Sequence, residues 1–353
     1  MAFSRTDAAI AARAFPAASM AVTSAGRLVA LRAFGRLTYD SESATVSPAT
    51  LFDLASLTKV VATTAMAMVL YERGMLDLDA PVAGIVPEFA KSGDRDPRRN
   101  KVSLKMLLAH SSGLPAHEKF FLKARGREEL LQMVFKTPLI AEPGSRSVYS
   151  DVGFMVLGEA LERIAEEPLD RFCQREVFGP LGMAHTTYAP PAESRGQIPP
   201  TQDDQTFRKR VIQGEVQDEN ASVLGGIAAQ AGVLSTAEDL AHFAHAMLGG
   251  VPAIVRPETV ALFTQRESTP AGTSRALGWD TPSGEPSQSG KYFSKRTFGH
   301  LGYTGTSLWI DPARQLSVVL LTNRSWPDCA NWAIKQVRPQ FHDAVVEALD
   351  AVS

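Results

Sequence analysis

Short apolar runs near both ends of the chain predict β-strands there. Residues 19–23 and 27–34 are strand-like, and Ser24-Ala25-Gly26 between them is typical of a hairpin turn. Residues 307–311 and 316–323 have the same character near the end of the chain. We therefore expect one sheet that is built from both chain ends.

A longer apolar segment follows the first pair of strands and predicts a helix over residues 53–73. Asp53 stands where an N-cap is expected, and Gly74 stands where a left-handed C-terminal cap is expected. The middle of this segment, residues 60–70, is apolar on every side. Because such a helix has no face suited to water, we expect it at the centre of a domain.

Helical spacing dominates the rest of the chain. Residues 102–109, 151–166 and 236–248 predict helices, and an amphipathic helix begins near residue 330. We expect Pro339 to interrupt this last helix, because proline removes a backbone donor and its ring clashes with the preceding turn.

These patterns together predict an α+β fold, in which helices flank an antiparallel sheet and a mainly helical segment is inserted between its two halves. The expected α/β domain comprises residues 1–75 and 221–353, and the mainly helical domain comprises residues 76–220. We expect the active site in the cleft between the two domains.

Composition and charge narrow the function classes. Apolar residues make up 44% of the chain and charged residues 21%, as in ordinary globular proteins. With 36 basic and 38 acidic side chains, the net charge of −2 gives no field for gathering nucleic acid. The longest apolar run is about half a bilayer span, so no membrane segment is expected. Charged residues interrupt the apolar N-terminus, so we expect a cytoplasmic protein, or a periplasmic one if a leader has been removed.

Several familiar catalytic patterns are missing from the sequence. It contains no G-x-S-x-G, no Walker A loop, no G-x-G-x-x-G after a strand and no H-E-x-x-H. His242 and His245 lie three residues apart, but no cysteine or carboxylate pattern supports a metal there. Cys173 and Cys329 are expected to be buried free thiols. We therefore expect neither a metal nor a cofactor.

The first indication of chemistry is Ser56-Leu57-Thr58-Lys59, at the start of the buried segment. A spacing of three places the hydroxyl and the amine on one helical face. Serine needs a neighbouring base to become a nucleophile, and burial together with the helix dipole is expected to disfavour the ammonium form of Lys59. Lys59 is therefore a candidate base for Ser56. Since S-x-x-K occurs by chance about once in a chain of this length, its surroundings decide its weight.

Two further segments add candidates. Tyr149-Ser150-Asp151 precedes a predicted helix, and a tyrosine of lowered pKa beside a lysine can move a proton between serine and leaving group. Residues 299–306 (GHLGYTGT) contain three glycines, which suggests a backbone that approaches something closely. Taken singly, each segment also has a structural explanation, as a surface tyrosine near a helix cap and as a tight strand entry.

Together the three elements resemble the serine β-lactamase and penicillin-binding-protein superfamily, in its class C β-lactamase-like branch. That branch includes family VIII carboxylesterases, D-alanyl-D-alanine carboxypeptidases and D-aminopeptidases. The order matches, with S-x-x-K early, a Y-x-N-type motif about ninety residues later and a K-T-G-type motif near the end. Residues 107–114 (LLAHSSGL) also resemble a stretch common in that branch. The likeness extends from about Phe15 to Phe341 and implies a β-lactamase-like fold.

The resemblance implies a role for each matching residue. Ser56 would be the acylated nucleophile, Lys59 its proton partner, and Tyr149 the general base and acid. The N–H groups of Ser56 and Tyr303 would form the oxyanion hole. The implied reaction is acyl transfer through an acyl-enzyme.

Two departures from the family pattern bear on the substrate. His300-Leu301-Gly302 stands where Lys-Thr-Gly is usual, so a mostly neutral imidazole replaces a fixed cation in the wall beside the substrate. Asp151 stands where asparagine is usual, and its carboxylate cannot donate a hydrogen bond to an amide carbonyl but would pair with Lys59. Both changes remove groups that hold anionic, amide-bearing substrates, whereas neutral esters lose less.

We therefore predict a carboxylesterase acting on a small-molecule ester or amide. The alternatives are a D-Ala-D-Ala carboxypeptidase or β-lactamase, an acyltransferase, and an inactive ligand-binding scaffold. Asp218-Glu219-Asn220 is either a rim of the cleft or a solvated loop, and Trp279 either walls an acyl pocket or packs in the core. The oligomeric state stays open. The expected substrate-binding residues are Asp151, His300, Gly302 and Tyr303.

Overall fold

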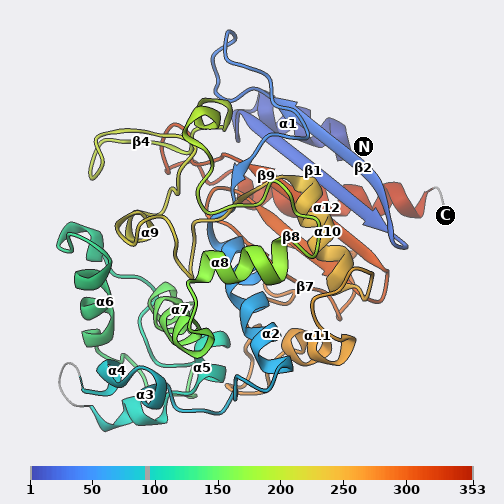
Figure 1. Ribbon diagram of the computed structural model, residues 1–353. Helices are drawn as coiled ribbons and strands as arrows, with labels where there is room; N and C mark the ends of the chain where they lie inside the picture. Colours follow the sequence, from blue (N-terminus) through green and yellow to red (C-terminus); the bar gives the residue numbers. More distant parts are fainter. Residues whose placement is uncertain (1, 92–95, 352–353) are drawn as a thin grey trace.

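A five-stranded antiparallel sheet made from both chain ends forms one side of the molecule (Figure 1). The computed structural model describes residues 2–91 and 96–351. The strand order is β2-β1-β9-β8-β7, so the first hairpin pairs with strands from the end of the chain, as expected. The strands are β1 (Ala17–Ser24), β2 (Arg27–Gly35), β7 (Phe298–Leu301), β8 (Ser307–Asp311) and β9 (Leu316–Thr322).

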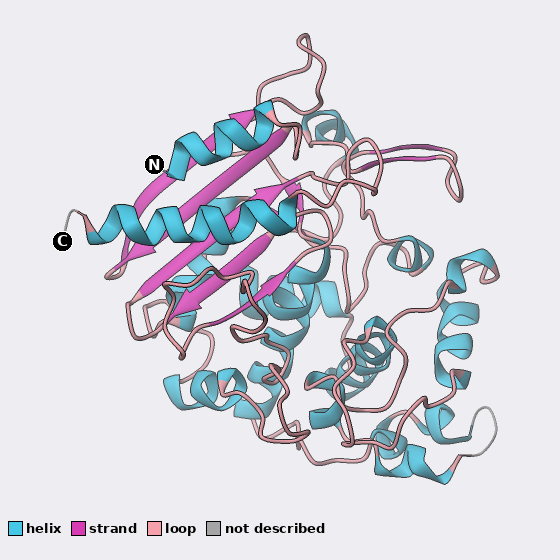
Figure 2. Cartoon of the chain, turned by 180° about the vertical axis from the view of Figure 1, so that it is seen from behind, coloured by secondary structure: helices cyan, strands magenta, loops and turns pink. Residues whose placement is uncertain are grey.

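Alternate side chains of the central strands enter two separate apolar layers. Met20 and Val22 pack with the helices α1 (Ala2–Ala11) and α12 (Ile334–Asp350), which lie together on one face of the sheet (Figure 2). Ala21 and Val319 face the opposite side and join the main core with α10 (Ala237–Met247). The period of two along a strand thus gives each face of the sheet its own helical cover.

The predicted interruption of the last helix is wrong, because α12 runs through Pro339 without a break. A proline cannot donate to the carbonyl four residues earlier, which here belongs to Lys335. The side-chain amide of Gln288 donates to that carbonyl oxygen at 3.0 Å. The acceptor left open by the proline therefore has another donor, and the helix continues.

The buried segment after the hairpin is not one uniform helix. Asp53 belongs to the short strand β3 (Phe52–Asp53), which pairs with β6 (Leu234–Ser235), so it is not a helix N-cap. A 3₁₀ turn over Ala55–Leu57, a π-helical turn over Lys59–Thr64 and the helix α2 (Ala65–Glu72) follow. The burial is as predicted, since no residue from Val60 to Leu70 is more than 3% exposed. Gly74 ends the segment in the expected left-handed conformation.

Residues 76–220 are mostly helical, but they also contain a small hairpin. The predicted helix over 151–166 is α7, and the one over 102–109 is shorter, as α5. The apolar core runs without interruption from the sheet into these helices, so the division into two domains stays a prediction. The elements are α3 (Val82–Ile85), α4 (Pro87–Lys91), α5 (Leu104–Leu108), α6 (Arg127–Lys136), α7 (Asp151–Ala165), α8 (Leu169–Cys173), β4 (Gln202–Asp204) and β5 (Arg210–Ile212), followed later by α9 (Glu219–Val223) and α11 (Pro257–Thr264). None of the helices in the described ranges is long and apolar enough to cross a membrane.

One buried amide at the end of β9 connects three parts of the chain. The side chain of Asn323 accepts from the N–H of Ala17 at 3.1 Å and donates to the carbonyls of Leu37 and Pro200 at 3.0 and 2.9 Å. Asn323 is only 1% exposed, so water cannot replace these hydrogen bonds.

We expect Asn323→Ala to lower the free energy of unfolding by about 3 kcal/mol, because it leaves three buried backbone groups unpaired. The measurement is the urea midpoint. The matched control is Asn331→Ala, since the half-exposed Asn331 also donates to a carbonyl, that of Arg13, and should cost less than about 1 kcal/mol. Equal losses in the two variants would contradict the prediction.

Candidate active site

A cleft of about 860 Å³ gathers the residues that the sequence analysis selected. Lys59 lies below the floor of this cleft and is fully buried. The turn that carries Ser56, the N-terminus of α7 and the end of β7 all open onto it. Six of the seven predicted site residues line the cleft, namely Ser56, Tyr149, Asp151, His300, Gly302 and Tyr303.

The ammonium group of Lys59 is at the centre of the site. It donates to Ser56 Oγ at 3.1 Å, to Asp151 Oδ1 at 2.7 Å and to the carbonyl of Gln230 at 2.9 Å. The predicted pairing of Lys59 with Asp151 is thus confirmed. Since all three donors of the ammonium are used, the Lys59 side chain is held in one position beneath the serine.

Two expectations about protonation are wrong. Burial lowers the pKa of Lys59, but the charge of Asp151 and the contact with Tyr149 outweigh it, so the pKa is raised above its ordinary value. Burial raises the pKa of the Tyr149 phenol, and Asp151 adds to this against the opposing influence of Lys59. Burial also opposes ionisation of Asp151, but Lys59 and His117 keep its pKa below its usual range. At neutral pH the site therefore holds an ammonium, a carboxylate and a neutral phenol.

The phenol of Tyr149 lies against Lys59 and Ser56. The Lys59 ammonium is 4.9 Å from the centre of the Tyr149 ring, and its positive charge partly offsets the effect of burial on the pKa of the phenol. The phenol of Tyr149, which is distant in the sequence, therefore meets the neighbouring hydroxyl of Ser56 and amine of Lys59 at one end of the cleft.

His110 fixes the segment that carries Tyr149. Its Nδ1 accepts from the N–H of Ser150 at 3.0 Å, and its carbonyl accepts from the N–H of Val148 at 2.8 Å. The His110 ring also packs on Tyr149, with ring centres 4.7 Å apart. Burial lowers the pKa of His110 well below its ordinary value, so the ring is neutral. The segment 107–114, which the resemblance had singled out without a role, thus positions the tyrosine.

Two threonines hold the turn after β7 against the backbone just before Ser56. Thr304 Oγ1 donates to the carbonyl of Asp53 at 2.7 Å, and Thr306 Oγ1 donates to that of Leu54 at 2.9 Å. A side chain at Gly302 would meet Thr306 Oγ1 at 1.9 Å, so only glycine fits there. The N–H of Tyr303 has no acceptor among the residues that the structure describes.

His300 is a neutral member of the wall. Its ring Nδ1 donates to the carbonyl of Leu301 at 2.8 Å, which leaves Nε2 as a lone-pair acceptor. Burial, together with the charges of Lys59 and Arg275, lowers the pKa of His300 to about 3. The side chain therefore carries no positive charge for a substrate, as the sequence analysis expected.

Among the cleft residues that the sequence analysis missed, two lie close to Asp151 and Tyr149. His117 Nδ1 lies 3.8 Å from Asp151 Oδ2, and this neighbouring carboxylate raises the pKa of His117 despite partial burial. The Arg275 guanidinium lies 5.1 Å from the centre of the Tyr149 ring and pairs with Asp280. Both residues come from irregular segments without a motif, so no sequence signal indicated them.

The open alternatives around the cleft are resolved by burial. Asp218 and Glu219 line the cleft, whereas Asn220 is buried and holds the N–H of Phe121. Trp279 is 1% exposed and packs between Phe243 and Phe298, so it belongs to the core.

The two cysteines are both free, but only Cys173 is fully buried. Cys329 is half-buried and lines the cleft, contrary to the expectation. In residues 2–91 and 96–351, no group of three His, Cys, Asp or Glu side chains could hold a metal ion.

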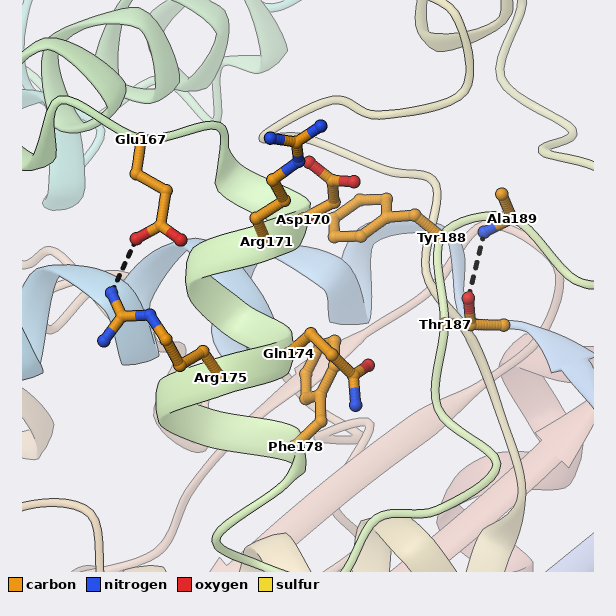
Figure 3. Close-up of a pocket in the computed structure, with 9 residues that line it drawn as sticks. All are labelled: Glu167, Asp170, Arg171, Gln174, Arg175, Phe178, Thr187, Tyr188 and Ala189. Atoms are coloured by element: carbon orange, nitrogen blue, oxygen red, sulfur yellow. Dashed lines mark hydrogen bonds and ion pairs between the residues drawn. The ribbon is translucent and has the colours of Figure 1, made fainter.

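A second hollow, of about 490 Å³, lies beside α8 and is lined mainly by charged and polar side chains (Figure 3). Its Arg175 and Glu167 pair with each other at 2.6 Å (Figure 3). None of its lining residues carries a hydroxyl that is bonded to a lysine or a histidine, so the larger cleft stays the candidate active site.

A comparison with models of protein families assigns the chain. The model described as Beta-lactamase matches residues 4–333. The chain belongs to the beta-lactamase family. Among curated proteins, a putative D-alanyl-D-alanine carboxypeptidase of Salmonella typhimurium is 32% identical, over 90% of this chain and 81% of the relative.

Solved structures show the same beta-lactamase fold. EstCE1, described as a hydrolase with promiscuous acyltransferase activity, has a TM-score of 0.79 and 22% identity over 98% of this chain and 97% of its own. A class C beta-lactamase from Rhodobacter sphaeroides has a TM-score of 0.75 and 21% identity, over 99% of both chains. The predicted superfamily and fold are confirmed.

The direction of the pKa shifts gives a prediction for Asp151→Asn. Loss of the carboxylate removes the charge that raises the pKa of both Lys59 and Tyr149, so both values should fall. The pH at which the site loses one proton should then fall by about one unit or more. The measurement is the pH dependence of the rate at which a fluorophosphonate labels Ser56.

Asp280→Asn is the matched control, because Asp280 lines the same cleft but pairs with Arg275. In Asp280→Asn, the labelling rate should change over the same pH range as in the unmodified protein. If the pH dependence of labelling does not shift in Asp151→Asn, or shifts equally in both variants, the role of the Asp151 charge is contradicted.

Proposed function

We propose that the protein is a serine hydrolase that cleaves carboxylic esters through an acyl-enzyme on Ser56. The observation that carries this proposal is the contact of 3.1 Å between the buried Lys59 ammonium and Ser56 Oγ, at the floor of an open cleft. Membership of the beta-lactamase family supports the same reaction class.

The protonation states determine the order of events. With Lys59 charged and Tyr149 neutral at rest, the cluster must first release one proton to solvent. Ser56 Oγ then attacks the ester carbonyl while its proton passes to the Tyr149–Lys59 pair, and the N–H groups of Ser56 and Tyr303 receive the developing oxyanion. The C–O bond breaks, and the pair returns the proton to the leaving alcohol. A water molecule repeats the sequence on the acyl-enzyme and releases the acid.

Neutral esters suit this cleft better than anionic substrates that carry an amide side chain. His300 is uncharged, and the Asp151 carboxylate is already engaged by Lys59 and can only accept hydrogen bonds. Neither residue can donate to an amide side chain of a substrate in the way that an asparagine and a lysine would. An ester needs only a carbonyl for the oxyanion hole and a space for its two substituents.

The direct test is hydrolysis of p-nitrophenyl acetate and butyrate. Ser56→Ala should lower kcat by at least about 10³-fold, because the reaction loses its nucleophile, and an acyl adduct on Ser56 should appear in the mass spectrum of the unmodified protein. Ser222→Ala is the control, since Ser222 is a half-buried serine outside the cleft.

Each other result points elsewhere. Activity that survives Ser56→Ala would remove Ser56 from the chemistry. Transfer of the acyl group to an added alcohol at the expense of hydrolysis would indicate an acyltransferase. Absence of any adduct would indicate an inactive binding scaffold.

A second candidate function is carboxypeptidase activity on D-Ala-D-Ala peptides. The Salmonella typhimurium relative bears that name, and Arg275 supplies a cation on the His300 side of the cleft. The Arg275 side chain is 20% exposed, so a substrate carboxylate can reach it. This guanidinium could take the place of the family's usual lysine.

For this second function, Arg275→Gln should raise KM for a D-Ala-D-Ala peptide about tenfold or more, because a charge-assisted hydrogen bond to the substrate carboxylate is lost. KM for neutral p-nitrophenyl butyrate should stay within about twofold, which makes the ester the internal control. If both substrates are affected alike, Arg275 does not recognise a carboxylate.

A further inference from the structure

Two buried guanidinium groups lie behind the turn that carries Tyr303. Arg338, in α12, is 5% exposed, and Arg324, directly after β9, is fully buried. Neither forms an ion pair with any acidic side chain that the structure describes. Burying a guanidinium without a carboxylate is costly, so these two positive charges call for an explanation.

Both arginines donate to backbone carbonyls of the same turn. Arg338 Nη2 donates to the carbonyl of Gly302 at 2.7 Å and to that of Thr306 at 2.8 Å. Arg324 Nε donates to the carbonyl of Tyr303 at 2.6 Å. The Arg324 guanidinium also stacks over the Tyr303 ring, 4.2 Å from its centre.

The carbonyl of Gly302 and the N–H of Tyr303 belong to one peptide group. A cation that binds the oxygen of a peptide draws electron density from its nitrogen, which makes the N–H a stronger donor. The bond also fixes the plane of the peptide and hence the direction of that N–H. Since the Tyr303 N–H has no acceptor in the described part of the chain, its direction is set from the carbonyl side.

We propose that Arg338 is a positioning residue that orients and polarises the Gly302–Tyr303 peptide as an oxyanion donor, with Arg324 holding the next carbonyl. This inference rests on the proposed acyl transfer at Ser56. Arg338 also borders the cleft, but its bond to the Gly302 carbonyl directs its charge through the peptide, so its effect appears where negative charge develops on the substrate's carbonyl oxygen.

A structural role alone accounts less well for these contacts. Any neutral donor could satisfy the carbonyls of Gly302 and Thr306, whereas Arg338 keeps a full charge there and leaves its own Nε without an acceptor in the described residues. Burial, with a smaller contribution from Arg324, lowers the pKa of Arg338 to about 9, which still leaves it charged at neutral pH.

The test uses two variants. Arg338→Gln keeps a hydrogen-bond donor but removes the charge, and Arg338→Lys keeps the charge but loses the planar guanidinium group. The first readout is the rate at which a fluorophosphonate labels Ser56, since phosphonylation also develops charge on an oxygen in the hole. The second is the affinity for a phenylboronic acid, which forms a tetrahedral adduct on serine. Arg338→Gln should lower both about tenfold, a fraction of the roughly 10²–10³-fold loss seen when an oxyanion donor is removed. KM for p-nitrophenyl butyrate should stay within about twofold in Arg338→Gln. In Arg338→Lys, the labelling rate and the boronic acid affinity should lie between those of Arg338→Gln and of the unmodified protein.

Arg99→Gln is the matched control for loss of a buried arginine. Arg99 is also fully buried and donates to the carbonyls of Phe89, Phe135 and Thr137, in the helical part of the molecule. It should lower Tm as much as Arg338→Gln does, and leave the labelling rate of folded protein within about twofold of the unmodified protein.

The outcomes separate this inference from the proposed function. Labelling of folded Arg338→Gln at the unmodified rate, or an equal loss of labelling in Arg99→Gln, would overturn the role of Arg338. If Ser56 is labelled but no ester is cleaved, the ester assignment fails. The ratio of the labelling rates of Arg338→Gln and the unmodified protein then still tests the role of Arg338. If the unmodified protein is not labelled at Ser56, both proposals are overturned.

Discussion

The buried ion pair between Lys59 and Asp151 is the interaction on which the site depends. A lysine that is 0% exposed needs a partner close by, and the carboxylate at 2.7 Å meets that need. The same contact joins the turn that carries Ser56 to the N-terminus of α7, which places Tyr149 beside this serine. A charge that is expensive to bury thus determines how two segments 92 residues apart are aligned.

The rest of the site is aligned by hydrogen bonds to backbone carbonyls. Thr304 and Thr306 connect the turn after β7 to residues 53 and 54, and His110 holds the strand-like segment before α7. Each of these contacts is buried, so water cannot compete for it. The cleft is therefore formed before a substrate enters, as electrostatic stabilisation of an oxyanion requires.

Much of the fold could be predicted from the sequence, and the reasons for the failures are specific. The strands β1 and β9 are short, nearly continuous apolar runs because both of their faces are buried, and α7 follows the helical period of its apolar positions. The segment after Asp53 is buried on all sides, so its apolar positions show no period. Without a period, the sequence could not distinguish a short strand and a π-helical turn from one continuous helix. Pro339 was misjudged because its effect depends on Gln288, a residue distant in the sequence.

The same limit applies to the site. Ser56, Lys59 and Tyr149 carry motifs, whereas His117 and Arg275 enter the cleft from loops whose course is set by tertiary packing. The protonation states were misjudged for a related reason. Burial was visible in the sequence, but the strength of Asp151 as a neighbour of Lys59 and Tyr149 depends on distances that only folding creates.

Pairing of β1 with β9 has a consequence for the newly made chain. Residue 18 finds its partner at residue 322, so about 300 residues must be synthesised between the two strands before they can pair. Such long-range pairing slows folding, because a large loop must close first. Until then the hairpin of β1 and β2 lacks its neighbour in the sheet, so the turn after β7 can be held against residues 53 and 54 only once the two distant parts of the chain have come together.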